Sequence, residues 1–186
     1  MARYREFDPD RALHDAMLVF WRNGYANTTM AQLVEATGVV RASLYSTFGN
    51  KAALFRKAIE RYSEFQASRV ADAESPGQAL LAWFADAVRG APAGELPTGC
   101  LLINTASEYG TLDPELQRLV KAHLARVHQF FHHCVAKVAP DLDAEATANV
   151  LMGANVSIYL LGRTGAPEGC LRDIADAALA PIAARL

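Results

Sequence analysis

The chain has 186 residues, 52% of them hydrophobic and 20% charged, so it can bury a substantial core in one or two domains. No apolar run approaches the roughly 18 residues that a membrane span needs, and the charged opening MARYREFDPD is unlike a signal peptide. We therefore expect a cytoplasmic protein without a membrane partner. The three widely spaced cysteines suit neither a disulfide framework nor a zinc module and are expected to be reduced thiols.

The charge is distributed unevenly along the chain. Residues 1–62 carry nine Lys and Arg against six Asp and Glu, whereas the remainder carries nine against fourteen. A basic N-terminal part is what a nucleic-acid contact confined to one end would require. A charge difference of this size also arises by chance, so it supports nucleic-acid binding only together with a DNA-binding motif.

Nearly every segment shows the apolar spacing of a helix, and no β-branched run is bounded by hairpin turns, so the predicted fold class is all-α. The first helix is predicted to begin where Asp8 caps a helix whose first residue is Pro9. The same helix is predicted to end at Gly24.

Two short helices are predicted next. Thr29 with Gln32 forms a capping box for one that stops at Gly38, and the other runs from about Arg41 to Phe48. Two short helices joined by such a turn and packed on a longer first helix are what a helix-turn-helix requires.

The rest of the chain is also predicted to be helical. Asn50 caps a fourth helix, which is followed by a break at Ser75-Pro76-Gly77, a fifth helix through Val88 and a loop over residues 89–98. The remaining predicted helices span Cys100 to Tyr109, residues 114–139, Ala144 to Leu161 and Glu168 to Ala184.

Residues 28–51, TTMAQLVEATGVVRASLYSTFGNK, resemble the DNA-binding signature of the TetR/AcrR family, and the first helix matches through Phe20, Gly24 and Tyr25. The resemblance covers about the first third of the chain. It implies a homodimeric bacterial transcription regulator that represses its genes, with an activator as the alternative, because the sequence does not encode where the operator lies relative to a promoter. It also implies a helix-turn-helix domain at residues 1–50, and a helical-bundle effector and dimerisation domain at 51–186 that opens with a linking fourth helix.

The resemblance assigns roles to individual residues. Thr29, Tyr45 and Lys51 match positions that hold phosphates, the first and last at helix N-termini where the dipole helps. The positions matching the base-reading face are Arg41, Ala42, Ser43, Ser46 and Thr47. Arg41 is the one side chain there able to contact guanine through two hydrogen bonds, with a phosphate contact as the alternative. Val40 stands where the family commonly has a Ser or Thr cap.

Residues 98–108, TGCLLINTASE, resemble a Gly-Cys-Leu segment of one subgroup, some of whose members respond to reactive electrophiles through the cysteine. Cys100 is thus a candidate sensor, because a thiol at a helix N-terminus ionises more readily; the alternative is a small buried hydrophobe. Candidates for the effector pocket are residues whose polar groups or rings interrupt apolar faces, and for each an ordinary core or interface role is the alternative: Trp83, Cys100, Asn104, Glu108, His123, Phe130, Asn155 and Tyr159.

The last two predicted helices are rich in Ala and Gly, which let helices approach closely. A two-fold axis would double this pair into a four-helix dimer interface. The expected partners are a second copy of the chain, double-stranded DNA with a pseudo-palindromic operator, and an unidentified small molecule.

Three other classes of function find less support in the sequence. An enzyme lacks support because no nucleophile motif or phosphate-binding glycine loop accompanies the thiols and histidines. A metal site at His128 and His132 has helical spacing but no evident further ligand, so no metal or cofactor is expected. A ligand-binding module that has lost DNA binding is opposed by the retained Arg41, Tyr45 and Lys51.

Overall fold

The computed structural model describes residues 7–68, 70–90 and 96–186, and every regular element within these ranges is helical, as the sequence predicts. None of the described helices is long and apolar enough to cross a membrane. The elements are α1 (Pro9–Asn23), α2 (Met30–Thr37), α3 (Arg41–Phe48), α4 (Lys51–Ser68), α5 (Pro76–Arg89), α6 (Leu101–Ala106), η1 (Tyr109–Thr111), α7 (Pro114–Val138), α8 (Ala144–Arg163), α9 (Glu168–Leu179) and η2 (Ala183–Arg185).

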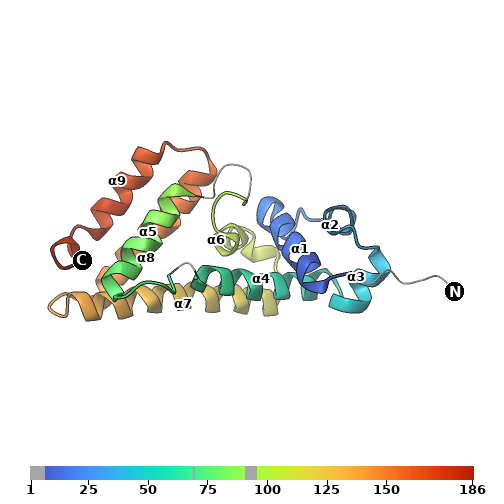
Figure 1. The fold of residues 1–186 in the computed structure, drawn as a ribbon, viewed down its shortest axis with the longest axis horizontal. Helices are drawn as coiled ribbons and strands as arrows, with labels where there is room; N and C mark the ends of the chain where they lie inside the picture. The colour runs from blue at the N-terminus through green and yellow to red at the C-terminus, as the bar shows by residue number, and fades with distance from the viewer. Residues whose placement is uncertain (1–6, 69, 91–95) are drawn as a thin grey trace.

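The molecule is elongated, with α1–α3, which we call the head, at one end, and α5, α8 and α9 at the other (Figure 1). The helices α4 and α7 run along one side, and α6 lies between the two ends (Figure 1). We call α5–α9 the body. Because α4 packs on both α1 and α7, it connects the head to the body mechanically.

Local capping signals fix the starts of the helices. The Asp8 side chain accepts hydrogen bonds from two backbone N–H groups at the start of α1, and Thr29 and Gln32 form the predicted reciprocal box at the start of α2. The Asn50 carbonyl oxygen Oδ1 accepts from the N–H of Ala53 at 2.8 Å. These three predicted helix starts are confirmed.

Other boundaries differ from the prediction. The chain leaves α4 after Ser68, and Ser75 is the cap of α5 rather than the centre of a break. The last long helix ends at Leu179, five residues early, because Pro181 has no N–H to donate to a continuing helix. Of the predicted loop, residues 91–95 lie outside the described residues.

Aromatic packing joins α4 to the head. The ring of Phe55 on α4 lies 4.7 Å from that of Phe20 and 4.9 Å from that of Tyr25, centroid to centroid. Two turns further along α4, Tyr62 meets Trp21 of α1 edge to face at 4.8 Å. Aromatic pairs of this kind add about 0.5–1.5 kcal/mol each beyond burial, so a movement of α4 carries α1 with it.

Candidate DNA-binding and effector sites

The helix α3 presents a short exposed surface at the end of the head. Leu44 and Phe48 anchor it by burying their side chains in the hydrophobic core, and α3 packs on α2. The exposed side chains are those of Arg41, Ala42, Tyr45, Ser46 and Thr47, all predicted DNA contacts. The prediction is wrong for Ser43, which is only 6% exposed because it lies on the inward side of the helix next to Leu44.

Arg41 and Tyr45 form a pair on this surface. They stand one helical turn apart, with the guanidinium carbon 5.4 Å from the ring centroid and Nη2 donating to the tyrosine hydroxyl at 3.3 Å. Val40, 65% exposed, makes no side-chain cap, so the first N–H groups of α3 lack that partner, as expected from the sequence. Unsatisfied N–H groups and a guanidinium together suit an anionic ligand at this helix start.

The other two predicted phosphate contacts are engaged inside the head. The Lys51 ammonium donates to the Thr28 carbonyl at 2.7 Å and lies 4.4 Å from the Tyr25 ring centroid. Burial lowers the pKa of Lys51, against an opposing effect of the Glu108 carboxylate. The Thr29 hydroxyl belongs to the capping box. Both residues stabilise the connection that presents α2 and α3.

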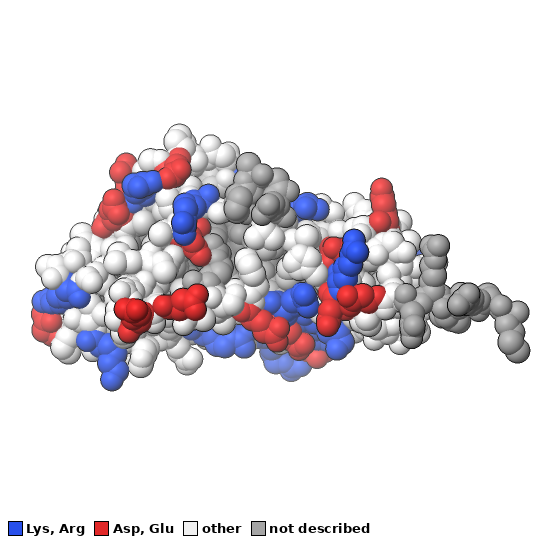
Figure 2. All heavy atoms as spheres, in the orientation of Figure 1, with Lys and Arg blue, Asp and Glu red and all other residues white. Residues whose placement is uncertain are grey.

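The basic excess of the N-terminal part is partly neutralised internally. Arg56 is paired with Glu115 of α7, and Arg61 lies 3.9 Å from the Asp10 carboxylate. Lys and Arg are interleaved with Asp and Glu along the lower edge of Figure 2, where Figure 1 shows α4 and α7. Arg41 is the one basic residue that α3 itself carries.

Four hydrogen bonds, which we call the head–body clasp, fix the end of α1 to the body. The Glu108 carboxylate accepts from the Ala26 N–H at 2.8 Å, and the Trp21 indole N–H donates to the Gly99 carbonyl at 3.1 Å. Arg163 at the end of α8 donates to the carbonyls of Trp21 and Arg22, where a helix C-terminus favours a cation. Glu108 therefore serves the clasp and does not line the cavities described below. Its role as a pocket residue stays a prediction.

A glycine is required beneath the Glu108 carboxylate. Gly24 has a φ of +79°, and a Cβ at this position would lie 1.9 Å from Oε1 of Glu108. The glycine that ends α1 therefore also makes room for the clasp.

A cavity of about 230 Å³ opens between α4, α5 and α7. Of the predicted pocket residues, Trp83, His123 and Phe130 line it together. The other lining residues were not predicted from the sequence: Ser63, Gln66, Ala67, Val70, Arg126 and Val127. Their spacing of three or four residues along α4 and α7 is the signal that could have found them.

The other predicted pocket residues lie elsewhere. Asn155 is buried, and its side-chain oxygen accepts a hydrogen bond from the Trp83 indole N–H at 2.8 Å. Asn155 therefore orients the Trp83 ring and does not line the cavity itself. Tyr159 borders a separate cavity of about 190 Å³ near Gly99 and the end of α8. Asn104 lies next to Gly99, and its buried amide nitrogen has no hydrogen-bond partner among the described residues.

Cys100 stands at the N-cap position of α6, where its side chain makes no cap hydrogen bond, and it is 3% exposed. Burial raises the pKa of its thiol, and the opposing effects of Tyr62, Gln66 and two backbone groups are smaller. The expectation of a readily ionised thiol is therefore wrong. Burial likewise raises the pKa of Cys134 to about 11. Cys170 is the exposed cysteine.

The burial of Cys100 has a measurable consequence. We expect N-ethylmaleimide to modify Cys100 in the native protein only through local opening of the fold, because the attacking species is the thiolate. Peptide mass spectrometry over time should find Cys100 labelled more slowly than Cys170 and should find this difference abolished in urea. Labelling of Cys100 ahead of Cys170 in the native protein would contradict the burial argument.

The predicted metal pair, His128 and His132, does not converge on a common site in the described residues. His128 Nε2 lies 3.0 Å from the Asn149 side-chain oxygen, whereas His132 is exposed one turn further along. Within the described ranges, no three His, Cys, Asp or Glu side chains are grouped so that they could hold a metal ion.

Two family profiles match the chain. The profile described as bacterial regulatory proteins of the tetR family matches residues 12–58, and that described as the tetracyclin repressor-like C-terminal domain matches residues 76–174. The first covers the helix-turn-helix and the second most of the body, so together they follow the division seen in the fold.

Curated relatives and solved structures agree with these profiles. The chain is 30% identical to the uncharacterized HTH-type transcriptional regulator YezE of Bacillus subtilis, over 96% of this chain and 98% of YezE. It is 30% identical to the HTH-type transcriptional repressor ComR of Escherichia coli, over 95% and 90% of the two chains. A cysteine mutant of the regulator CifR, solved with 26-base-pair operator DNA, superposes with a TM-score of 0.81 at 27% identity over 96% and 98% of the chains. The chain therefore belongs to the TetR family of bacterial transcriptional regulators.

Proposed function

We propose that this chain is a cytoplasmic repressor that binds a pseudo-palindromic operator as a homodimer and leaves it when a small molecule occupies the cavity between α4, α5 and α7. The main observation behind this proposal is the exposed surface of α3, which carries an arginine and begins without a side-chain cap. The clasp holds the head that presents this surface to the body. The similarity to ComR, a named repressor, and to CifR, solved on operator DNA, supports it.

Each domain has a proposed part. Residues 1–50 bind DNA, with α3 in the major groove and Arg41, Ala42, Ser46 and Thr47 facing bases. Thr29, Tyr45 and Lys51 contact phosphates, for which Lys51 exchanges its internal carbonyl partner. Residues 51–186 bind the effector and the second subunit.

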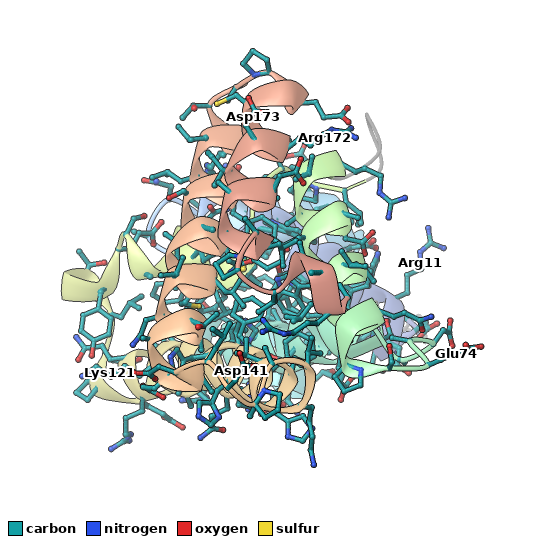
Figure 3. The ribbon with its side chains drawn as sticks, turned by 90° about the vertical axis from the view of Figure 1, so that its left-hand side faces the viewer. Arg11, Glu74, Lys121, Asp141, Arg172 and Asp173 are labelled. Carbon is teal, nitrogen blue, oxygen red and sulfur yellow. The ribbon has the colours of Figure 1, made fainter. Side chains whose placement is uncertain are left out.

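We place the dimer interface on α8 and α9. The two helices stand side by side at the end of the body, and Arg172 and Asp173 mark the upper end of α9 (Figure 3). Val150 and Leu160 on α8 are 57% and 54% exposed, a large apolar exposure that a second copy would cover. Exposed Gly153 lies between them on a spacing of three and seven residues, which lets a partner helix approach closely.

Release from DNA is proposed to pass through α4. A ligand in the cavity touches Ser63, Gln66 and Ala67 of α4, and α4 is locked to α1 by aromatic contacts. A shift of α4 therefore changes the spacing of the two heads in the dimer, and operator binding depends on that spacing. The burial of Cys100 favours such a noncovalent effector over a reactive electrophile.

In vitro selection from random duplexes, followed by fluorescence anisotropy on the selected operator, tests the proposal. We expect two inverted half-sites and an affinity that falls steeply with salt. Arg41→Ala should cost about 1–3 kcal/mol on the preferred site and relax one base position, whereas Lys51→Ala and Tyr45→Phe should weaken all sequences alike. Lys137→Ala, at the far end of α7, is the matched control and should change neither.

Two results would count against this assignment. An unchanged base preference in Arg41→Ala would show that Arg41 contacts a DNA phosphate and not a base. Enrichment of an isolated half-site, or a monomer by light scattering at the working concentration, would contradict the proposal that a dimer binds the operator.

A further inference from the structure

The effector cavity is lined by two chemically distinct sets of side chains. Trp83 and Phe130 form an aromatic wall with ring centroids 5.2 Å apart, and Val127 adds to the apolar lining. The lining also carries polar groups from α4 and α7, among them Ser63 and Arg126. A ligand that fills this cavity must therefore combine an apolar ring with one polar end.

Arg126 is the charged group at this polar end. Its side chain is exposed at the cavity, and its Nη2 donates to the Ser63 hydroxyl at 3.3 Å. No Asp or Glu of the described residues lies within ion-pair distance of this guanidinium. A guanidinium without a carboxylate partner, beside an apolar wall, selects an anion.

The neighbouring histidine adds no second charge. His123 is buried, its Nδ1 lies 3.2 Å from the Ser63 hydroxyl, and its pKa is lowered to about 4 by burial and by Arg126. Among the described residues of the lining, Arg126 thus carries the single positive charge at neutral pH. One such charge matches a monoanion, whereas a dianion would leave charge uncompensated in a partly apolar site.

From this arrangement, and resting on the proposed function, we infer that the effector is a small monocarboxylic acid with one ring. Its carboxylate is held by Arg126 and Ser63, and its ring lies against Trp83 and Phe130. The size follows from the volume, because about 230 Å³ is below the roughly 300–1,000 Å³ of pockets for drug-sized ligands. The position of Arg126 at the edge of the cavity keeps the ion pair partly hydrated, which limits the desolvation cost.

Isothermal titration calorimetry on the full-length protein tests the inference with four probes of known chemistry. Benzoate offers the ring and the single charge, benzamide the ring without the charge, acetate the charge without the ring, and phenyl phosphate a ring with a dianion. We expect benzoate to bind about tenfold to hundredfold more tightly than benzamide, the range for a hydrogen bond to a charged group. Acetate and phenyl phosphate should both bind more weakly than benzoate.

Variants assign the preference to one side chain. Arg126→Gln should abolish the preference for benzoate over benzamide while leaving benzamide binding unchanged. Lys137→Gln makes the same charge change eleven residues further along α7, away from the cavity lining, and should keep the preference. Retention of the preference in Arg126→Gln, equal binding of benzoate and benzamide, or tighter binding of phenyl phosphate would each overturn the inference.

A DNA measurement separates this inference from the proposed function. Benzoate should lower the anisotropy of protein bound to its selected operator in the parent protein and in Lys137→Gln, but not in Arg126→Gln. A protein that binds its operator and ignores benzoate overturns the ligand class alone. A protein that selects no operator overturns the proposed function, whatever the calorimetry gives.

Discussion

Replacement of Gly24 by alanine is expected to lower the free energy of unfolding by about 3–5 kcal/mol. Two costs combine. The backbone at φ +79° and ψ 173° lies in a region that is essentially restricted to glycine. The new Cβ would also overlap the Glu108 carboxylate at 1.9 Å, and that carboxylate cannot retreat without giving up its bond to the Ala26 N–H. Urea denaturation followed by circular dichroism measures the loss.

A double-mutant cycle separates these two costs. In a Glu108→Ala background the overlap is gone, so Gly24→Ala should cost about 1–3 kcal/mol less than in the parent protein. Gly110→Ala is the matched control, because its Cβ would meet open space without a positive φ, and it should change stability by less than about 0.5 kcal/mol. Equal costs for Gly24→Ala in the two backgrounds would show that the carboxylate does not press on this position.

The head could be predicted from the sequence because its signals are local. A cap such as Asp8, or the pair Thr29 and Gln32, acts within three residues of the helix that it starts. Gly38 likewise ends α2 with a left-handed backbone, as predicted. Ser43 was misplaced because the resemblance gives a role to each position but not the rotation of α3 against the core.

The effector region could not be predicted in this way. In the sequence, Glu108 is a polar residue that interrupts an apolar face. In the fold its carboxylate accepts a hydrogen bond from the backbone N–H of Ala26, 82 residues away. A backbone donor so distant in the sequence cannot be identified from the pattern of side chains. Asn155 was placed among ligand contacts, whereas it satisfies the Trp83 indole. Long-range pairs of this kind depend on the packing of helices, and helical periodicity gives only the face of each helix.

Cys100 shows how two local effects can be ranked wrongly. The sequence places this thiol at a helix start, where the dipole lowers a thiol pKa. The folded chain buries it, and loss of hydration outweighs the dipole and the neighbouring hydrogen bonds, so the pKa rises. Whether a single side chain is buried depends on the tertiary packing. The direction of the pKa shift of Cys100 could therefore not be predicted from the sequence.

His123 should make the protein less stable in acid. Its folded pKa is about 4, below the value of 6.5 for a free histidine, so the neutral ring is favoured in the fold. The resulting stabilisation is fully present above pH 6.5, declines as the pH falls from 6.5 to 4, and is absent below 4. Because the ring is buried, the loss across this window is about 3 kcal/mol.

The groups around His123 explain why it stays neutral. Ser63 Oγ faces Nδ1 at 3.2 Å, the Tyr62 ring lies 6.2 Å away between centroids, and Arg126 contributes a like charge. No carboxylate of the described residues pairs with the imidazole. Protonation therefore places a second cation beside Arg126 on a buried ring, which lowers the stability of the folded state.

Urea unfolding at a series of pH values between 7.5 and 4.5 measures this contribution, with His123→Gln as the variant that cannot titrate. Glutamine keeps a polar group near Ser63, so its pH profile should lack the loss assigned to His123 while retaining that of every other group. His132→Gln, at an exposed position on the same helix, should keep the parent profile. Parallel profiles for the parent and His123→Gln, or an NMR titration of His123 with a pKa near 6.5, would mean that water reaches the ring in the folded state. The cavity would then be wetter than its aromatic wall implies, and a charged ligand would gain less from Arg126 there.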